Sequence, residues 1–90
     1  MTTAIDTTRT DKWARLQFTT ADRLSKALDF ADMSVQEMAD NLGMSRQTVG
    51  NYMSGRTTPR LVVLKQWALT TGVPLEWLQT GHFPKPQPRD

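Results

Sequence analysis

Apolar side chains recur at helical spacing in five stretches of this sequence, and capping or turn residues separate those stretches. The spacing predicts helices over about residues 21–31, 34–42, 45–53, 59–71 and 74–79. Thr19 or Thr20 would cap the first helix. Thr58 would cap the fourth, because proline suits the first position of a helix and Pro59 follows directly. The predicted fold class is therefore all-α, with five helices.

One side of each predicted helix carries the residues expected to form a shared core. They are Leu24, Ala27, Leu28 and Ala31 in the first helix, Val35, Met38, Ala39 and Leu42 in the second, Val49 and Tyr52 in the third, Leu61, Leu64, Trp67 and Ala68 in the fourth, and Leu75 and Leu78 in the fifth. Glycines follow the last four helices. Glycine adopts a left-handed conformation without steric cost, so these positions predict helix ends.

The segments outside the helices divide the chain into three parts. These are an N-terminal arm and docking segment at 1–18, a folded domain at 19–82, and a Pro-rich disordered tail, or a linker, at 83–90. The threonine-rich start lacks periodicity, which predicts a mobile arm. Trp13, Leu16 and Phe18 are expected to dock on the domain, and their alternation with polar residues allows a short extended segment.

The stretch from Ser34 to Tyr52 predicts two short helices that pack at a steep angle. Ser34 and Glu37 have the spacing of a capping box. Ala39 is small enough for the point where the helices cross, and Gly43 follows four residues later at the turn. Met44, Val49 and Tyr52 supply the inward anchors that the second helix needs, with Met38 and Leu42 completing the core. This combination is typical of a helix-turn-helix, whose second helix lies in the DNA major groove.

Composition excludes several other classes of protein. The chain has 90 residues, which make one small domain, and no cysteine, so it has neither a disulfide nor a thiolate metal site. His82 is its single histidine. We see no catalytic pair, no cofactor or metal motif and no small-molecule site, so we expect no enzyme. The sequence has no apolar run that could span a membrane and no signal peptide, which predicts a cytoplasmic protein.

Charge is distributed unevenly, although the formal net charge is only +2. Residues 1–40 hold two more acidic than basic side chains, and residues 76–90 are balanced. Residues 41–75 contain no acid and four basic side chains, Arg46, Arg56, Arg60 and Lys65. An acid-free segment over the second helix of the pair and the loop behind it favours a polyanionic partner.

The pattern resembles the lambda Cro/cI type of repressor, also called the XRE family. The resemblance covers about Ala21 to Gly81, and its most specific parts are Gln36-Glu37-Met38-Ala39, Leu42 to Val49, Tyr52 to Pro59 and Thr71 to Gly81. It implies a five-helix, lambda-repressor-like DNA-binding domain. One position departs from the family. Many members carry a phosphate-binding glutamine four residues before the crossing alanine, whereas here that residue is Val35 and the glutamine is Gln36.

The resemblance also implies which residues contact DNA. Arg46, Gln47 and Asn51 match the positions from which family members reach base edges, and their side chains can pair with guanine or adenine. Gly50 lies on the same face, where a residue that weakens the helix suggests close approach to DNA. The alternative for Arg46, Gln47 and Asn51 is a solvated helix face, and the surrounding pattern favours base contact. The candidates for phosphate contacts are Gln36, Ser45, Thr48, Arg56, Thr57 and Arg60, and Arg9, Lys12 and Arg15 of the arm could reach a groove.

These observations predict a sequence-specific regulator that binds double-stranded DNA, most simply a phage or bacterial repressor that blocks a promoter. A homodimer would place two recognition helices one DNA turn apart, about 34 Å. Trp77 is the expected dimer contact. Two alternatives remain open: an antitoxin-like or adaptor module that binds another protein, and a recombination-directionality factor that bends DNA.

Overall fold

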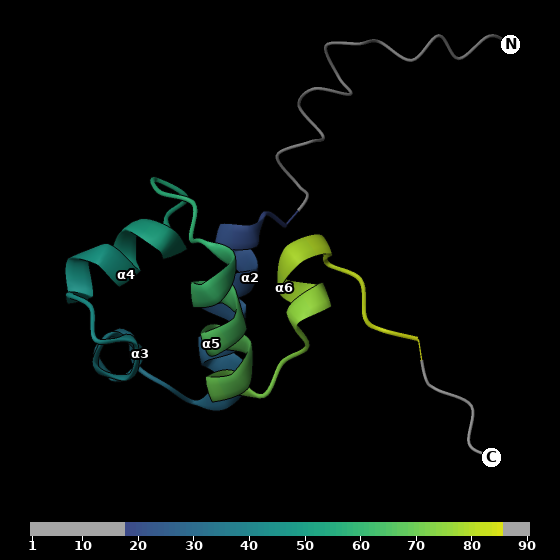
Figure 1. The fold of residues 1–90 in the computed structure, drawn as a ribbon, viewed down its shortest axis with the longest axis horizontal. Coiled ribbons are helices and arrows are strands. Elements are labelled where there is room, and N and C mark those ends of the chain that lie inside the picture. The colour runs from purple at the N-terminus through teal and green to yellow at the C-terminus, as the bar shows by residue number, and fades with distance from the viewer. Residues whose placement is uncertain (1–17, 86–90) are drawn as a thin grey trace, which may run out of the picture.

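The computed structural model describes residues 18–85, and within them the chain forms five helices joined by short turns (Figure 1). They are α2 (Thr20–Ala31), α3 (Val35–Leu42), α4 (Arg46–Met53), α5 (Leu61–Thr71) and α6 (Leu75–Thr80). The described residues contain no strand. The predicted all-α, five-helix fold is confirmed. The predicted docking of Trp13 and Leu16 lies outside the described residues, whereas Phe18, predicted to dock with them, is 64% exposed. The proposed domain limits remain predictions.

Two helix starts are fixed by reciprocal hydrogen bonds between side chains and backbone. At α3 the Ser34 Oγ accepts from the Glu37 amide at 3.1 Å, and the Glu37 carboxylate accepts from the Ser34 amide at 3.0 Å. This is the predicted capping box. Thr19 and Asp22 form a second box at the start of α2, at 3.2 and 3.0 Å. Each box satisfies backbone donors that a helix start would otherwise leave without partners.

The core lies between α2 and α5, and the other helices close its open sides. Helix α2 packs against α4, α5 and α6, and α5 packs against α2, α3 and α6. Trp67 is fully buried, and its indole N–H donates to the Leu24 carbonyl at 3.2 Å. The other buried apolar side chains are Leu24, Ala27, Leu28, Met38, Ala39, Val49, Val63, Leu64, Ala68 and Leu78.

The predicted start of the fourth helix was wrong. Helix α5 begins at Leu61, its N-cap is Arg60 rather than Thr58, and no side chain caps it. Pro59 is buried, so the chain enters the core extended and turns into a helix only after Arg60, whose ψ is 162°. Leu61, predicted to face inward, is 48% exposed. It lies at the edge of a stripe formed by Val63, Leu64, Trp67, Ala68 and Thr71.

Arg23 is a buried charged residue that was not predicted from the sequence. Its guanidinium donates to the carbonyls of Leu78, Gln79 and Phe18 at 3.0, 3.2 and 2.8 Å, and to the Thr20 hydroxyl at 3.2 Å. These bonds fasten the end of α6 to the start of α2. The available signal was its position four residues before Ala27, which places it on the buried side of the helix.

Candidate nucleic-acid interface

The α3–α4 pair is locked by a tight turn at its centre. Gly43 has a φ of 67°, a left-handed value that side chains with a Cβ rarely adopt. Its amide donates to the Asp40 carbonyl at 3.2 Å, and the Met44 amide donates to the Ala39 carbonyl at 3.0 Å. Ala39 itself is fully buried. The predicted crossing residue and turn glycine therefore hold α4 in one orientation against α3.

Helix α4 is anchored to the core through its buried side and is capped at its start. Val49 is fully buried, and Tyr52 packs against the core from the same helix. Ser45 caps the helix, because its Oγ accepts from the Thr48 amide at 3.1 Å and hydrogen-bonds to the Thr48 hydroxyl at 2.9 Å. The two predicted phosphate contacts at this helix start, Ser45 and Thr48, are thus joined to each other.

The opposite side of α4 is polar and lies at an edge of the domain (Figure 1). Arg46 and Gln47 are exposed, and Gly50 and Asn51 are partly exposed. A Cβ on Gly50 would meet no protein atom within 4 Å. Packing within the domain therefore gives no reason for glycine at this position of the helix. The four predicted base-reading residues share one accessible helix face.

The loop after α4 folds back onto the end of that helix. The Asn51 carbonyl accepts from the amides of Arg56 and Thr57 at 3.0 and 3.2 Å, and from the Ser54 hydroxyl at 3.2 Å. The side chains of Arg56, Thr57 and Arg60 are exposed. These three predicted phosphate contacts consequently extend the polar surface of α4 along the loop.

Gln36 has a different environment from the other phosphate candidates. It is exposed on α3, and its amide Nε2 donates to the Asp40 carboxylate at 2.9 Å. The second Nε2 hydrogen is left for a phosphate, which would lie near the negative charge of Asp40. Arg9, Lys12 and Arg15, the predicted arm contacts, lie outside the described residues.

A side-chain cluster that was not predicted from the sequence holds α3 against α5. The Asn41 Oδ1 accepts from Gln66 Nε2 at 3.0 Å and from the Thr70 hydroxyl at 2.8 Å. Gln66 Nε2 also donates to the Thr70 hydroxyl at 3.2 Å. No local sequence pattern indicates such a bridge, because its partners are 25 and 29 residues apart. It fixes the pair α3–α4 relative to the rest of the domain.

The described part of the chain contains neither a metal-ligating cluster nor a membrane-spanning helix. Between residues 18 and 85 no three histidine, cysteine or acidic side chains gather in a way that could hold a metal ion. Over the same residues, no helix has the length and apolarity needed to cross a membrane.

The chain was compared with known protein families and proteins. A family model described as helix-turn-helix matches residues 31–78, just over half of the chain, and includes α3, the turn and α4. No curated protein and no solved structure matches the chain. The matched segment contains the capping box, the crossing alanine, the turn glycine and the polar helix face described above. The chain therefore belongs to the Cro/cI, or XRE-type, family of helix-turn-helix DNA-binding regulators.

Proposed function

We propose that the protein is a sequence-specific repressor that occupies a double-stranded DNA operator and occludes an overlapping promoter, in a bacterium or in a phage-infected host. The observation that carries this proposal is the face of α4. Arg46, Gln47 and Asn51 project from a helix that is anchored by Val49, and Gly50 leaves the helix backbone accessible between them. DNA as the partner also implies a location in the cytoplasm.

Base reading is assigned to three side chains. Arg46 can donate two hydrogen bonds to guanine O6 and N7, while Gln47 and Asn51 can each pair with adenine N6 and N7. Their position near the start of an exposed helix suits a major groove, whose width admits one helix. Each good bidentate contact discriminates against the wrong base by about 1–3 kcal/mol.

Phosphate contacts are assigned to the surface around that helix. Arg56 and Arg60 supply charge without a neighbouring acid between residues 41 and 75, and Thr57 supplies a hydroxyl on the same loop. Ser45 and Thr48 are candidates at the helix start, Gln36 is a candidate on α3, and Arg9, Lys12 and Arg15 are candidates in the N-terminal arm. Such contacts set the position of the protein on DNA and make binding sensitive to salt, but they carry no sequence information.

A homodimer fits this mode of binding. Two copies related by a two-fold axis would present two α4 helices to half-sites one helical turn apart, and the operator would then be pseudo-palindromic. Occlusion needs no further activity, since a dimer on its site excludes any other protein from the same groove.

Selection of bound duplexes from a random DNA pool tests the proposal. We expect a recovered consensus that the protein binds at least a thousandfold more tightly than random duplex at physiological salt. Arg46→Ala and Gln47→Ala should each weaken consensus binding by about 5- to 150-fold and relax preference at one base position. Lys85→Ala is the matched control, because it removes an exposed charge outside α4 and the following loop. Absence of any consensus would refute the regulator.

The same reagents separate the two alternative functions. An adaptor should keep its partner binding when Arg46 and Gln47 are replaced, and it should show no consensus. A recombination-directionality factor should bend its site strongly, which circular permutation of the duplex would reveal.

A further inference from the structure

The α3–α4 pair is held against the rest of the domain at two boundaries. Helix α4 packs on α2, and α3 packs on α5. Met38 and Ala39 of α3 are fully buried, whereas the end of α3 nearest to the turn joins α5 through polar side chains. These side chains belong to Asn41, Gln66 and Thr70, which we call the α3–α5 cluster.

Three hydrogen bonds close the α3–α5 cluster. The Asn41 Oδ1 accepts from Gln66 Nε2 at 3.0 Å and from the Thr70 hydroxyl at 2.8 Å. Gln66 Nε2 also donates to the Thr70 hydroxyl at 3.2 Å. Gln66 and Thr70 are about one helical turn apart on α5, so two donors at different heights bind a single atom of α3. Together they fix the end of α3 both along α5 and across it.

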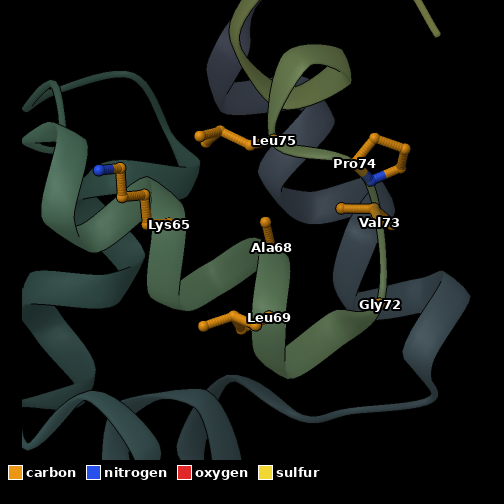
Figure 2. Close-up of a pocket in the computed structure, with 7 residues that line it drawn as sticks. All are labelled: Lys65, Ala68, Leu69, Gly72, Val73, Pro74 and Leu75. Atoms are coloured by element: carbon orange, nitrogen blue, oxygen red, sulfur yellow. The ribbon is translucent and has the colours of Figure 1, made fainter. Parts of the chain in front are cut away.

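The neighbouring residues of α5 belong to a different surface. Lys65 and Leu69 each precede a member of the α3–α5 cluster by one residue, and Figure 2 shows both beside the groove between α5 and the start of α6. Gln66 and Thr70 therefore form a separate polar stripe of α5, and their hydrogen bonds to Asn41 direct that stripe toward α3.

Apolar packing does not fill the boundary beside the α3–α5 cluster. A groove with a volume of about 320 Å³ lies there, and its lining residues are Asn41, Leu42, Met44, Val62, Val63 and Gln66. Closely packed side chains hold neighbouring helices in one arrangement, but an open groove leaves room for a shift. The hydrogen bonds of the cluster are therefore the contacts that fix the end of α3 at this boundary.

A shift at this end of α3 would move α4 as well. Asn41 lies two residues before Gly43, and the bond from the Met44 amide to the Ala39 carbonyl keeps the turn between the two helices tight. Helix α4 has eight residues, so it is about 12 Å long, and a rotation of about 10° at the turn moves its far end by about 2 Å. Hydrogen bonds form only over donor–acceptor distances of about 2.7–3.2 Å, so this rotation would break contacts to base edges.

Asn41 supplies a hydrogen-bond acceptor without a charge. Both of its bonds use Oδ1, which an aspartate would also offer. Aspartate would accept them more strongly, because hydrogen bonds to a charged group are the stronger kind. It would also place a negative charge in residues 41–75, which contain no acid. Stability of the cluster alone thus favours aspartate, whereas a polyanionic partner favours asparagine.

We propose that Asn41 is a positioning residue for base reading. Held by Gln66 and Thr70, it sets the angle at which α4 enters the major groove, and it thereby determines operator specificity without contacting DNA. The inference rests on the proposed function, which assigns base reading to α4. The effect falls on the preference between sequences, because a tilted α4 still brings the same charges to the DNA backbone.

Two substitutions test the cluster, and a third is the matched control. Asn41→Ala removes the shared acceptor, and Thr70→Val removes one donor at nearly constant volume. Gln36→Ala removes another exposed amide of α3, which bonds to Asp40 of the same helix rather than to α5. Titration of each full-length variant with the selected consensus and with random duplex, well below Tm, gives the ratio of the two affinities.

The ratio should fall at least fivefold in Asn41→Ala, which is the lower limit for losing one bidentate base contact, while affinity for random duplex stays the same. It should fall at least threefold in Thr70→Val, which keeps the bond to Gln66, and less than twofold in Gln36→Ala. A merely structural role of the cluster would lower Tm and leave the ratio unchanged. An unchanged ratio in Asn41→Ala and Thr70→Val, both folded by circular dichroism, would therefore overturn the proposal.

A double variant and a conservative variant test the link itself. Asn41→Ala combined with Thr70→Val should lose no more preference than Asn41→Ala alone, because both changes remove the same connection. Asn41→Asp keeps both bonds, so it should retain the wild-type ratio while binding consensus and random duplex more weakly by one common factor. Additive losses, or a ratio for Asn41→Asp as low as that of Asn41→Ala, would contradict the assigned role.

The angle of α4 can also be measured without DNA, which separates this inference from the proposed function. Residual dipolar couplings of the backbone amides should show α4 rotated against α2 and α5 by about 10° in Asn41→Ala, the rotation that breaks base contacts, and unrotated in Gln36→Ala. Rotation in a protein that prefers no sequence would refute the repressor and still support the cluster as the device that sets α4. Unrotated helices beside a clear wild-type consensus would overturn the inference and leave the repressor.

Discussion

Replacing Gly50 by alanine should make the free protein more stable and its DNA complex weaker. Gly50 lies inside α4, and a Cβ there meets nothing within 4 Å. Glycine inside a helix costs about 0.8–1.0 kcal/mol relative to alanine, mostly through the greater freedom of the unfolded chain. We therefore expect the free energy of unfolding to rise by about 0.4–1 kcal/mol, or roughly 2–8 °C in Tm for a domain of this size.

The DNA complex should respond in the opposite direction. If α4 lies in the major groove with Gly50 against the DNA, the added methyl group holds the helix away from the base edges. Losing one base contact of Arg46 or Asn51 would weaken operator binding by about 1–3 kcal/mol, or 5- to 150-fold. A purely solvated helix face would show the gain in stability and no loss of affinity.

Gly43→Ala provides the internal comparison. A Cβ at this position would also meet no protein atom within 4 Å, but the φ of Gly43 is 67°. Alanine in that left-handed conformation costs about 1–2 kcal/mol, so this variant should be less stable. Thermal unfolding and fluorescence anisotropy on the selected operator measure both effects. Destabilisation of the protein by Gly50→Ala, or operator binding by this variant as tight as that of the wild type, would contradict this role of Gly50.

Other parts of the fold can be tested by single substitutions. Arg23→Ala should lower the free energy of unfolding by about 2–4 kcal/mol, because the buried carbonyl of Leu78 and its neighbours lose a charged donor, and urea denaturation measures the loss. Asp32→Gly should raise the free energy of unfolding by up to about 1 kcal/mol in the same assay. Asp32 ends α2 with a left-handed φ of 56°, a conformation that glycine adopts more readily. Arg56→Ala and Arg60→Ala should each reduce the slope of log affinity against log salt by about 0.9 without changing the preferred sequence, as salt titrations of operator and random duplex would reveal.

Features that depend on hydrogen bonds between residues close in sequence were predictable from the sequence. The Ser34–Glu37 box and the turn at Gly43 involve residues three or four apart, and both are confirmed. The start of α5 was not predictable in the same way, because the burial of Pro59 depends on the assembled core and overrides the local preference of proline for a helix start. Phe83 illustrates the same limit. It was assigned to the tail, yet its ring stacks on Trp77.

In the candidate site, too, some features were predictable from the sequence and others were not. Which residues face outward on α4 follows from helical periodicity, and the structure places Arg46 and Gln47 on its exposed side as expected. The joining of Ser45 to Thr48, and of Gln36 to Asp40, could be seen only with side chains in place. Base reading and phosphate contact by these residues stay predictions, because they depend on a partner outside the chain.

The bonds of Arg23 also bear on how the domain opens. Helix α6 has six residues, far fewer than the roughly 12–15 that an isolated helix needs, so its order depends on Leu78 in the core and on the guanidinium at its end. It is therefore the expected first unit to detach in a partial unfolding event that leaves α2 to α5 intact. Loss of the Arg23 bonds would promote that opening, so Arg23→Ala should speed amide hydrogen exchange in α6 more than in α3. This six-residue helix is then in a local folding equilibrium that one side chain of α2 controls.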